Sequence, residues 1–364
     1  MRLSTSVVVL ILVVAVALVA LAAILWPRLG GRPAAVATGG WYEIYFTTPR
    51  YPDRPADRRG GLDERLVALI DGTKRSLDVA IYDFDLDNVA GAMARAKSRG
   101  VAVRMVTDTD TLEHRSAEVQ RALKTVQDAG IPVVDDQRRP IMHHKFAVFD
   151  GAAVLTGSWN FTVGDTYRLN NNAVLIRSPE LAANFTAEFE KMFTQRRFGP
   201  SKPKGVPHAH LTIGGARIET YFASEDDPSG RIIELLRSAR TRIDFLAFSF
   251  THEAIGQALL DRAADVKVRG VFETTGSETR FSEFGKLRQA GLEVYQDGNP
   301  YVMHHKVFVV DERITLFGSF NFSDSAASDN DENLLIVDDP GFARAFLQEA
   351  ERVVGQAKNP PARR

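Results

Sequence analysis

The order of apolar and polar segments repeats itself once along the chain. After residue 42, short apolar runs of the kind found in strands alternate with segments whose apolar residues recur at helical spacing. The helical patterns that match between the halves are Leu62, Leu66, Leu69, Ile70 and Ile232, Ile233, Leu235, Leu236. The matching strand-like runs are 76–84, 100–108 and 129–134 in the first half, and 242–250, 266–274 and 290–295 in the second. Such a repeat predicts two copies of one folding unit.

Alternating strands and helices predict crossover units around a mixed or mostly parallel sheet that is covered on both faces. The limits of the repeat place a first lobe at 42–198 and a second lobe at 211–356, joined by a segment rich in Pro and Gly. The predicted fold class is therefore α/β. We expect two pseudo-symmetric α/β/α sandwich lobes with mixed sheets that pack against each other.

The first 28 residues differ from the rest of the chain. Val7–Trp26 is an uncharged apolar run of twenty residues, and a helix of that length spans about 30 Å, one hydrocarbon core. Signal-peptide cores are shorter, about 7–15 residues. Residues 1–28 are therefore predicted to be an uncleaved membrane anchor, with the catalytic body outside the cytoplasm. Cleavage of a secretory signal after AVA at 35–37 is the alternative, and arginines on both flanks leave the orientation open.

Composition narrows the class of protein. The 364 residues suffice for two domains, and 45% hydrophobic with 25% charged residues is typical of globular proteins. The net charge of −1 includes three arginines before residue 34, so the body is mildly acidic, which does not favour nucleic acid as a partner. The absence of cysteine excludes disulfides, thiolate nucleophiles and cysteine-type zinc sites.

Four of the eight histidines lie in two nearly identical windows, IMHHKFAVFD at 141–150 and VMHHKVFVVD at 302–311. Each window continues into Gly-Ser-x-Asn, and the copies stay 161 residues apart from the histidines onward. The shared candidates are His143, Lys145, Asp150, Ser158 and Asn160 in the first copy, and His304, Lys306, Asp311, Ser319 and Asn321 in the second. Either motif alone is uninformative, but both at fixed spacing, twice, indicate a functional site.

Each window predicts a β-hairpin that presents polar groups at one rim. Residues i and i+2 of a strand point to the same face, so His143 and Lys145 project together, while His144 faces the other way as a structural neighbour. Lys, Ser and Asn side chains can hold a phosphate while one imidazole attacks phosphorus and the imidazole of the other copy protonates the leaving oxygen. Asp150 and Asp311 stand at turn positions where Asp is common for structural reasons.

The strings HHKFAVFD…GSWN and HHKVFVVD…GSFNFS…NDEN resemble the paired motifs of the phospholipase D superfamily, and the likeness covers nearly all of residues 42–355. The resemblance implies a two-lobed α/β/α/β/α sandwich with one active site between the lobes. It also implies a covalent phosphohistidine, no metal or other cofactor, and cleavage or transfer of phosphodiesters, mostly of phospholipids. The catalytic residues that it implies are His143, Lys145, Asp150, His304, Lys306 and Asp311.

The two copies differ at one supporting position, which is Glu332 in the second copy and Asn171 in the first. A carboxylate behind an imidazole raises the pKa of the ring and favours its protonated form, whereas an amide orients the ring without this effect. We therefore expect His304, supported by Glu332, to be the proton donor and His143 to be the nucleophile.

The predicted function is a phosphodiesterase of the phospholipase D type that hydrolyses or transfers phospholipid head groups and is held at a membrane by its N-terminal helix. The alternatives are a nuclease that cleaves DNA or RNA with the same histidines, and a phosphatidyl transferase similar to cardiolipin synthase. A scaffold that binds anionic lipid without turnover is disfavoured because both His-x-Lys triplets are intact. A monomer is expected because one chain carries both motifs.

Overall fold

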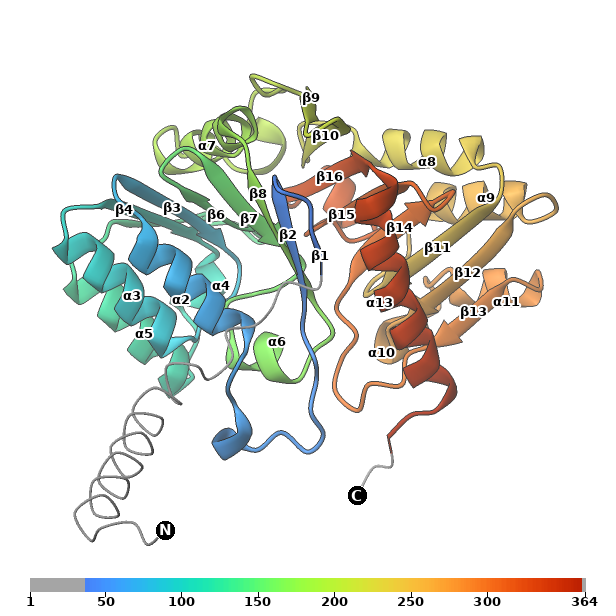
Figure 1. Cartoon of the computed structure of the whole chain (residues 1–364), viewed down its shortest axis with the longest axis horizontal. Coiled ribbons are helices and arrows are strands. Elements are labelled where there is room, and N and C mark those ends of the chain that lie inside the picture. Colours follow the sequence, from blue (N-terminus) through green and yellow to red (C-terminus); the bar gives the residue numbers. More distant parts are fainter. Residues whose placement is uncertain (1–36, 362–364) are drawn as a thin grey trace, which may run out of the picture.

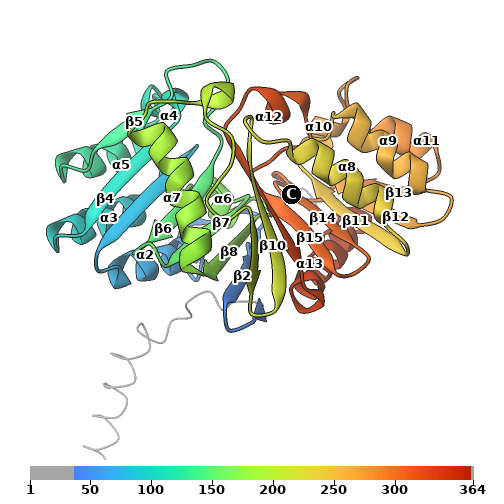
Figure 2. The same cartoon turned by 90° about the horizontal axis from the view of Figure 1, so that it is seen from above.

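The computed structural model describes residues 37–361, which fold into two lobes that lie side by side (Figure 1). Seen from above, the first half of the chain, from blue to green, and the second half, from yellow to red, form the two sides of the molecule (Figure 2).

The first lobe contains β1 (Ala37–Thr38), β2 (Tyr42–Phe46), α2 (Leu62–Gly72), β3 (Ser76–Ile81), α3 (Asp87–Ser98), β4 (Ala102–Thr107), α4 (Thr109–Leu112), α5 (Ala117–Asp128), β5 (Val133–Asp135), β6 (Lys145–Phe149), β7 (Ala153–Gly157), α6 (Val163–Tyr167), β8 (Asn172–Arg177) and α7 (Pro179–Phe193). The second lobe contains β9 (His210–Ile213), β10 (Ala216–Ala223), α8 (Pro228–Ser238), β11 (Arg242–Ala247), α9 (Glu253–Arg262), β12 (Lys267–Phe272), α10 (Thr274–Ser277), α11 (Phe284–Gln289), β13 (Glu293–Gln296), β14 (Lys306–Val310), β15 (Ile314–Gly318), α12 (Asp324–Ser328), β16 (Glu332–Asp338) and α13 (Pro340–Lys358).

The two sheets have the same strand order. It is β1-β2-β8-β7-β6-β3-β4-β5 in the first lobe and, read in the same sense, β9-β10-β16-β15-β14-β11-β12-β13 in the second. In the first sheet β3, β4 and β5 are parallel, whereas β6, β7, β8 and β2 pair antiparallel with their neighbours. The predicted α/β class, the mixed sheets and the pseudo-symmetry of the lobes are therefore confirmed.

Three hydrophobic cores define the layers. The central core lies between the lobes and joins α7, α13 and the inner faces of both sheets, through residues such as Phe185, Phe222, Phe317 and Phe346. The outer cores lie under α2, α3 and α5 in the first lobe and under α8, α9 and α11 in the second (Figure 1). The order of layers is therefore helix, sheet, helix, sheet, helix, as the resemblance implied.

The two central helices begin in the same way. The side chain of Ser178 caps α7 and that of Asp339 caps α13, and a proline follows each cap at the first helical position. Both arrangements satisfy backbone N–H groups that a helix leaves free at its start, and the proline has the φ that a helix requires. Each central helix thus begins directly after the last strand of its motif and packs back over the sheet.

The histidine windows form the predicted hairpins. β6 and β7 pair antiparallel, and Asp150 and Gly151 make the turn between them with φ of 55° and 61°. β14 and β15 repeat the arrangement, with Asp311 at φ 52°. Asp tolerates this left-handed conformation better than most residues, which explains the aspartate at this position.

None of the helices within residues 37–361 has the length and apolarity needed to cross a membrane. The predicted anchor at 1–28 lies outside the described residues.

Candidate active site

The His-x-Lys pairs stand at the beginning of β6 and β14, as the strand periodicity predicts. His143 is 5% exposed and His304 7% exposed, and the two lysines are buried beside them. Lys145 Nζ donates to the carbonyl of His143 at 2.9 Å, and Lys306 Nζ donates to that of His304 at 2.8 Å. Each imidazole is therefore held next to an ammonium group at a site that is almost closed.

The two imidazoles are supported from opposite lobes. His143 Nδ1 lies 2.7 Å from Glu332 Oε2, and His304 Nδ1 lies 3.0 Å from Asn171 Oδ1. The backbone also bonds across the interface between the lobes, where the amide of His143 donates to the carbonyl of Asp331 at 3.0 Å. The lobes thus form one site at their interface, with both Nδ1 atoms engaged and both Nε2 atoms left for chemistry.

This exchange corrects one prediction. Glu332 was expected to support His304 within its own copy, but it supports His143 across the interface, and Asn171 supports His304. The mistake arose because the repeat assigns each supporting residue to the window nearest in sequence. β8 and β16 instead run along the boundary between the lobes, where residues at the start of each strand meet the window of the opposite lobe.

The Gly-Ser-x-Asn motifs position the residues that hydrogen-bond to the imidazoles. A Cβ on Gly157 would lie 2.3 Å from the backbone oxygen of Asn172, so only glycine allows this approach. The next residue, Ser158, donates to Asn171 Oδ1 at 2.8 Å and accepts from the amide of Asn172 at 3.0 Å. Ser158 therefore fixes the amide that supports His304.

The second copy follows the same plan. Ser319 accepts from the amide of Asn333 at 2.9 Å. Asn160 Nδ2 donates to Asp165 Oδ1 at 3.3 Å, and the buried Oδ1 atoms of Asn160 and Asn321 have no hydrogen-bond partner among residues 37–361. These oxygens can accept from a substrate hydroxyl or water, whereas only the Nδ2 groups could donate to a phosphate, so the predicted phosphate contact of Asn160 and Asn321 stays a prediction.

Burial and the paired lysines set the electrostatics. Burial lowers the pKa of Lys145 to about 8 and lowers that of Lys306 well below its ordinary value, and Lys145 depresses the latter further. Burial and both lysines also lower the pKa of His143, and burial together with Lys306 lowers that of His304 to about 3. Because these lysines and imidazoles depress one another's pKa, an anion bound between them would stabilise their protonated forms, so protonation of the site and anion binding favour each other.

Two aromatic residues belong to the site and were missed by the sequence analysis. The ring of Tyr82 lies 5.1 Å from that of His143, and the ring of Phe248 lies 4.6 Å from that of His304. The lysine ammonium groups lie over the same rings, at 5.2 Å for Lys145 on Tyr82 and 4.4 Å for Lys306 on Phe248. The sequence did contain a signal for these two aromatic residues. Tyr82 is the first residue after β3 and Phe248 the first after β11, and these two strands correspond in the repeat.

The second histidine of each window faces away from the site, as predicted. His144 is fully buried with Nε2 3.1 Å from Glu188 of α7, and His305 Nε2 lies 3.0 Å from Glu349 of α13. Glu188 and Glu349 are again 161 residues apart. Each window is therefore tied to the central helix of its own lobe.

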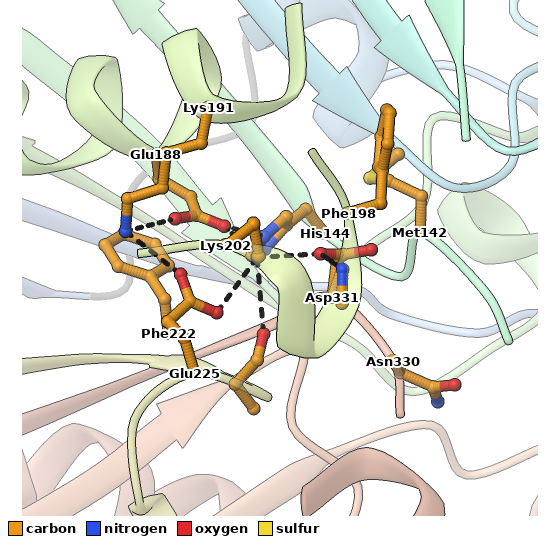
Figure 3. A network of polar contacts seen from close by, with 12 residues as sticks. Met142, His144, Glu188, Lys191, Phe198, Lys202, Phe222, Glu225, Asn330 and Asp331 are labelled. Atoms are coloured by element: carbon orange, nitrogen blue, oxygen red, sulfur yellow. Dashed lines mark hydrogen bonds and ion pairs between the residues drawn. The ribbon is translucent and has the colours of Figure 1, made fainter. Parts of the chain in front are cut away.

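Behind His144 lies a buried ionic cluster formed by Glu188, Glu225 and Asp331 around Lys202 (Figure 3). The Lys202 ammonium contacts Glu188, lies 2.7 Å from Asp331 and lies 3.1 Å from Glu225. His144, Glu188 and Asp331 have metal-ligand atoms within 4.8 Å of one another. The ammonium group lies among these atoms, so a cation of the protein itself takes the place that a metal would need.

Asp150 and Asp311 are not at the site, and their predicted catalytic role is wrong. Both stand at the far end of the strand that begins with the lysine. The carboxylate of Asp150 accepts from the backbone amides of Lys74, Arg75 and Ser76, and Asp311 accepts from those of Arg240, Thr241 and Arg242. They brace the loops that lead into β3 and β11, which is a structural role.

The family model for the cardiolipin synthase, PLD-like domain matches residues 66–193 and 232–354, one segment in each lobe. The chain belongs to the phospholipase D superfamily. It is 37% identical over 152 residues to human mitochondrial cardiolipin hydrolase, a match that covers 42% of this chain and 54% of that protein. It is 26% identical over 159 residues to a phospholipase D of Rickettsia bellii, covering 43% and 79%.

Among solved structures, phosphatidylserine synthase of Haemophilus influenzae matches 91% of this chain and 90% of its own, with a TM-score of 0.64 and 14% identity. This likeness concerns the fold alone. The chain spans about half the length of the human relative that it matches.

Proposed function

We propose that the protein is a phosphodiesterase of the phospholipase D type that hydrolyses or transfers phospholipid head groups. The observation that carries the proposal is the pair of imidazoles in one buried site, each held at Nδ1 by the opposite lobe and each beside a lysine. This arrangement offers two Nε2 atoms and two ammonium groups to a single phosphodiester.

In the first step, His143 Nε2 attacks phosphorus while the bond from phosphorus to the leaving oxygen breaks. The exchange of supports removes the ground on which His304 was expected to be the proton donor, so the assignment of His143 as nucleophile rests on a different argument. Burial raises the pKa of Glu332 to about 8, but the positive charge of a phosphorylated His143 ring, 2.7 Å away at Nδ1, favours the ionised carboxylate and is stabilised by it. His304 Nε2–H protonates the departing oxygen, and the negative phosphodiester between Lys145 and Lys306 raises the pKa of His304 enough for this role.

In the second step, neutral His304 takes a proton from water, the water oxygen attacks phosphorus, and the bond between phosphorus and His143 breaks. An alcohol in place of water gives transfer instead of hydrolysis. Both steps need only groups that the chain provides.

Three features support phospholipid as the substrate class. The curated relatives include proteins named cardiolipin hydrolase and phospholipase D. The predicted anchor would hold the site beside a bilayer. The net charge of −1 gives the chain no basic excess of the kind that binds a nucleic-acid backbone.

The test uses the purified full chain, mixed phospholipid vesicles, single-stranded DNA and a chelator. We expect release of head groups from the vesicles, loss of turnover in His143→Ala and His304→Ala, and a phosphoenzyme that maps to residue 143. Phosphoenzyme at residue 304 would reverse the assignment of the two histidines. Metal-dependent activity that survives both substitutions would refute the mechanism, and cleavage of DNA alone would make the protein a nuclease.

Hydrolysis and transfer are separated by adding a lipid alcohol, such as phosphatidylglycerol, and analysing the products. A phosphatidic acid product indicates hydrolysis, and a new diester that contains the acceptor indicates transfer.

A further inference from the structure

A buried carboxylate occurs in α6 of the first lobe and has no equivalent in the second lobe. Asp165 is 5% exposed, and the offset of 161 residues places Ala326 of α12 at the matching position. The supporting position shows the opposite difference, with Asn171 in the first copy and Glu332 in the second. Each copy therefore keeps one carboxylate near the site, but in a different place.

The carboxylate of Asp165 lies directly behind the support of His304. Asn171 Nδ2 donates to Asp165 Oδ1 at 3.0 Å, while Asn171 Oδ1 lies 3.0 Å from His304 Nδ1. Asp165 Oδ1 is itself 3.4 Å from the same Nδ1 atom. The ring is thus connected to a buried negative charge both through the amide and across a short gap.

We propose that Asp165 is the positioning residue of His304 and supplies to it the negative charge that Glu332 supplies to His143. This inference rests on the proposed function, in which His304 donates a proton in one step and accepts one in the next. A carboxylate near Nδ1 stabilises the imidazolium and keeps the Nε2–H directed at the leaving oxygen. Asp165 thereby replaces the carboxylate that position 171 lacks.

The charges around His304 agree with this role. Asp165 raises the pKa of His304, in opposition to burial, to Lys306 two residues along the same window and to Lys145 of the opposite lobe. Asp83 and Asp85, which follow β3, also lie near enough for the charge of Asp165 to raise their pKa.

A purely structural role for Asp165 has a different signature. Asp165 also accepts from Thr162 Oγ1 at 2.9 Å and from the amide of Asn160 at 3.1 Å, contacts that cap α6 and fix the motif loop. Loss of these contacts alone would lower stability, but it would not change how the rate depends on pH or on the leaving group.

The test compares the full-length protein with Asp165→Asn on two substrates. One is a phospholipid, whose alkoxide must be protonated, and the other is bis-p-nitrophenyl phosphate, whose phenolate leaves without a proton. For the phospholipid we expect kcat to fall about 10- to 100-fold, part of the 10²–10⁴ that a general acid contributes, with the alkaline limb of its pH profile at lower pH. The burst of nitrophenolate, which reports the first step alone, should change less than threefold, on the order of a small structural effect.

Two further variants make the outcome specific. The double variant D165A/N171E copies Ala326 and Glu332 and should restore most of the lost kcat and the position of the alkaline limb. Asp324→Asn changes an exposed acid in the first turn of α12 and should match the unmodified protein.

Equal losses on both substrates with an unmoved alkaline limb, or no recovery in the double variant, would overturn the role of Asp165. A readout without substrate separates this result from failure of the proposed function. In ¹⁵N-histidine-labelled protein, Asp165→Asn should move the Nδ1–H proton resonance of His304 upfield, because its hydrogen bond weakens. An unchanged resonance would overturn the inference, whereas an inactive protein with a shifted resonance would refute only the proposed function.

Discussion

Replacing Lys202 by methionine should destabilise the protein strongly, because this one side chain neutralises carboxylates from both lobes. Lys202 belongs to the segment between the lobes, and its ammonium is fully buried against Glu188 of the first lobe and Glu225 and Asp331 of the second. Burial alone would lower the pKa of Lys202, but the three carboxylates raise it above its ordinary value. Methionine keeps much of the volume and removes the charge.

The magnitude follows from the charges left behind. Removal of one partner from a buried ion pair typically costs about 3–5 kcal/mol, because the remaining charge stays buried without compensation. In the variant, Lys191 still lies 3.0 Å from Glu225 and Arg138 2.7 Å from Asp331, so these pairs limit the cost. We therefore expect a loss of about 3–5 kcal/mol in unfolding free energy at pH 8.

The deficit should depend on pH in a defined direction. Lys202 holds the pKa of Glu188 well below its ordinary value, in opposition to burial, and loss of the ammonium lets burial raise that pKa. The folded variant therefore binds protons more readily than the unfolded chain, whose carboxyl pKa is about 4.3. The loss of unfolding free energy is full above the raised pKa of Glu188 and shrinks as the pH falls through that pKa towards 5.

The assay is urea unfolding of the full chain, followed by circular dichroism at pH 8 and pH 5. Lys204→Met changes an exposed lysine two residues further along and should stay within about 0.5 kcal/mol of the unmodified protein. Adding Glu225→Gln to Lys202→Met should recover part of the loss. A deficit below 1 kcal/mol at pH 8, or one that is the same at both pH values, would refute the reasoning.

Three other predictions concern the site and its supports. Inhibition by inorganic phosphate should weaken as the pH rises through about 8, because Lys145 loses its proton there, and a Ki that is constant from pH 6 to 9 would contradict this. Asp150→Ala should lower the unfolding free energy by about 1–3 kcal/mol without changing kcat, whereas Asp150→Asn should retain most of the stability, since its Oδ1 can still accept from the backbone. Gly318→Ala should abolish turnover and lower the unfolding free energy by more than about 2 kcal/mol, because its Cβ would lie 2.1 Å from the backbone oxygen of Asn333. Turnover assays and urea unfolding measure the two effects.

The doubled pattern accounts for how much of the fold was predictable. Alternating strands and amphipathic helices predicted both sandwiches, and the i, i+2 spacing placed His143 and Lys145 on one face with His144 on the other. The Asp150 turn was predicted as well, but its carboxylate was also assigned a catalytic role that the fold excludes. The spacing that both halves share does not reveal that the lysine end of the strand faces the site and the aspartate end lies away from it.

Sequence by itself determined the elements, the two lobes and the identity of the paired histidines and lysines, because these depend on local periodicity and on a repeat that is visible along the chain. Only the tertiary structure decided which groups support which imidazole. Glu332 contacts His143 and Asp165 lies behind His304 because β8, β16 and α6 meet at the interface between lobes. Contacts of this kind join residues up to 189 positions apart, and their geometry is set by the packing of α7 and α13 in the central core rather than by any local pattern.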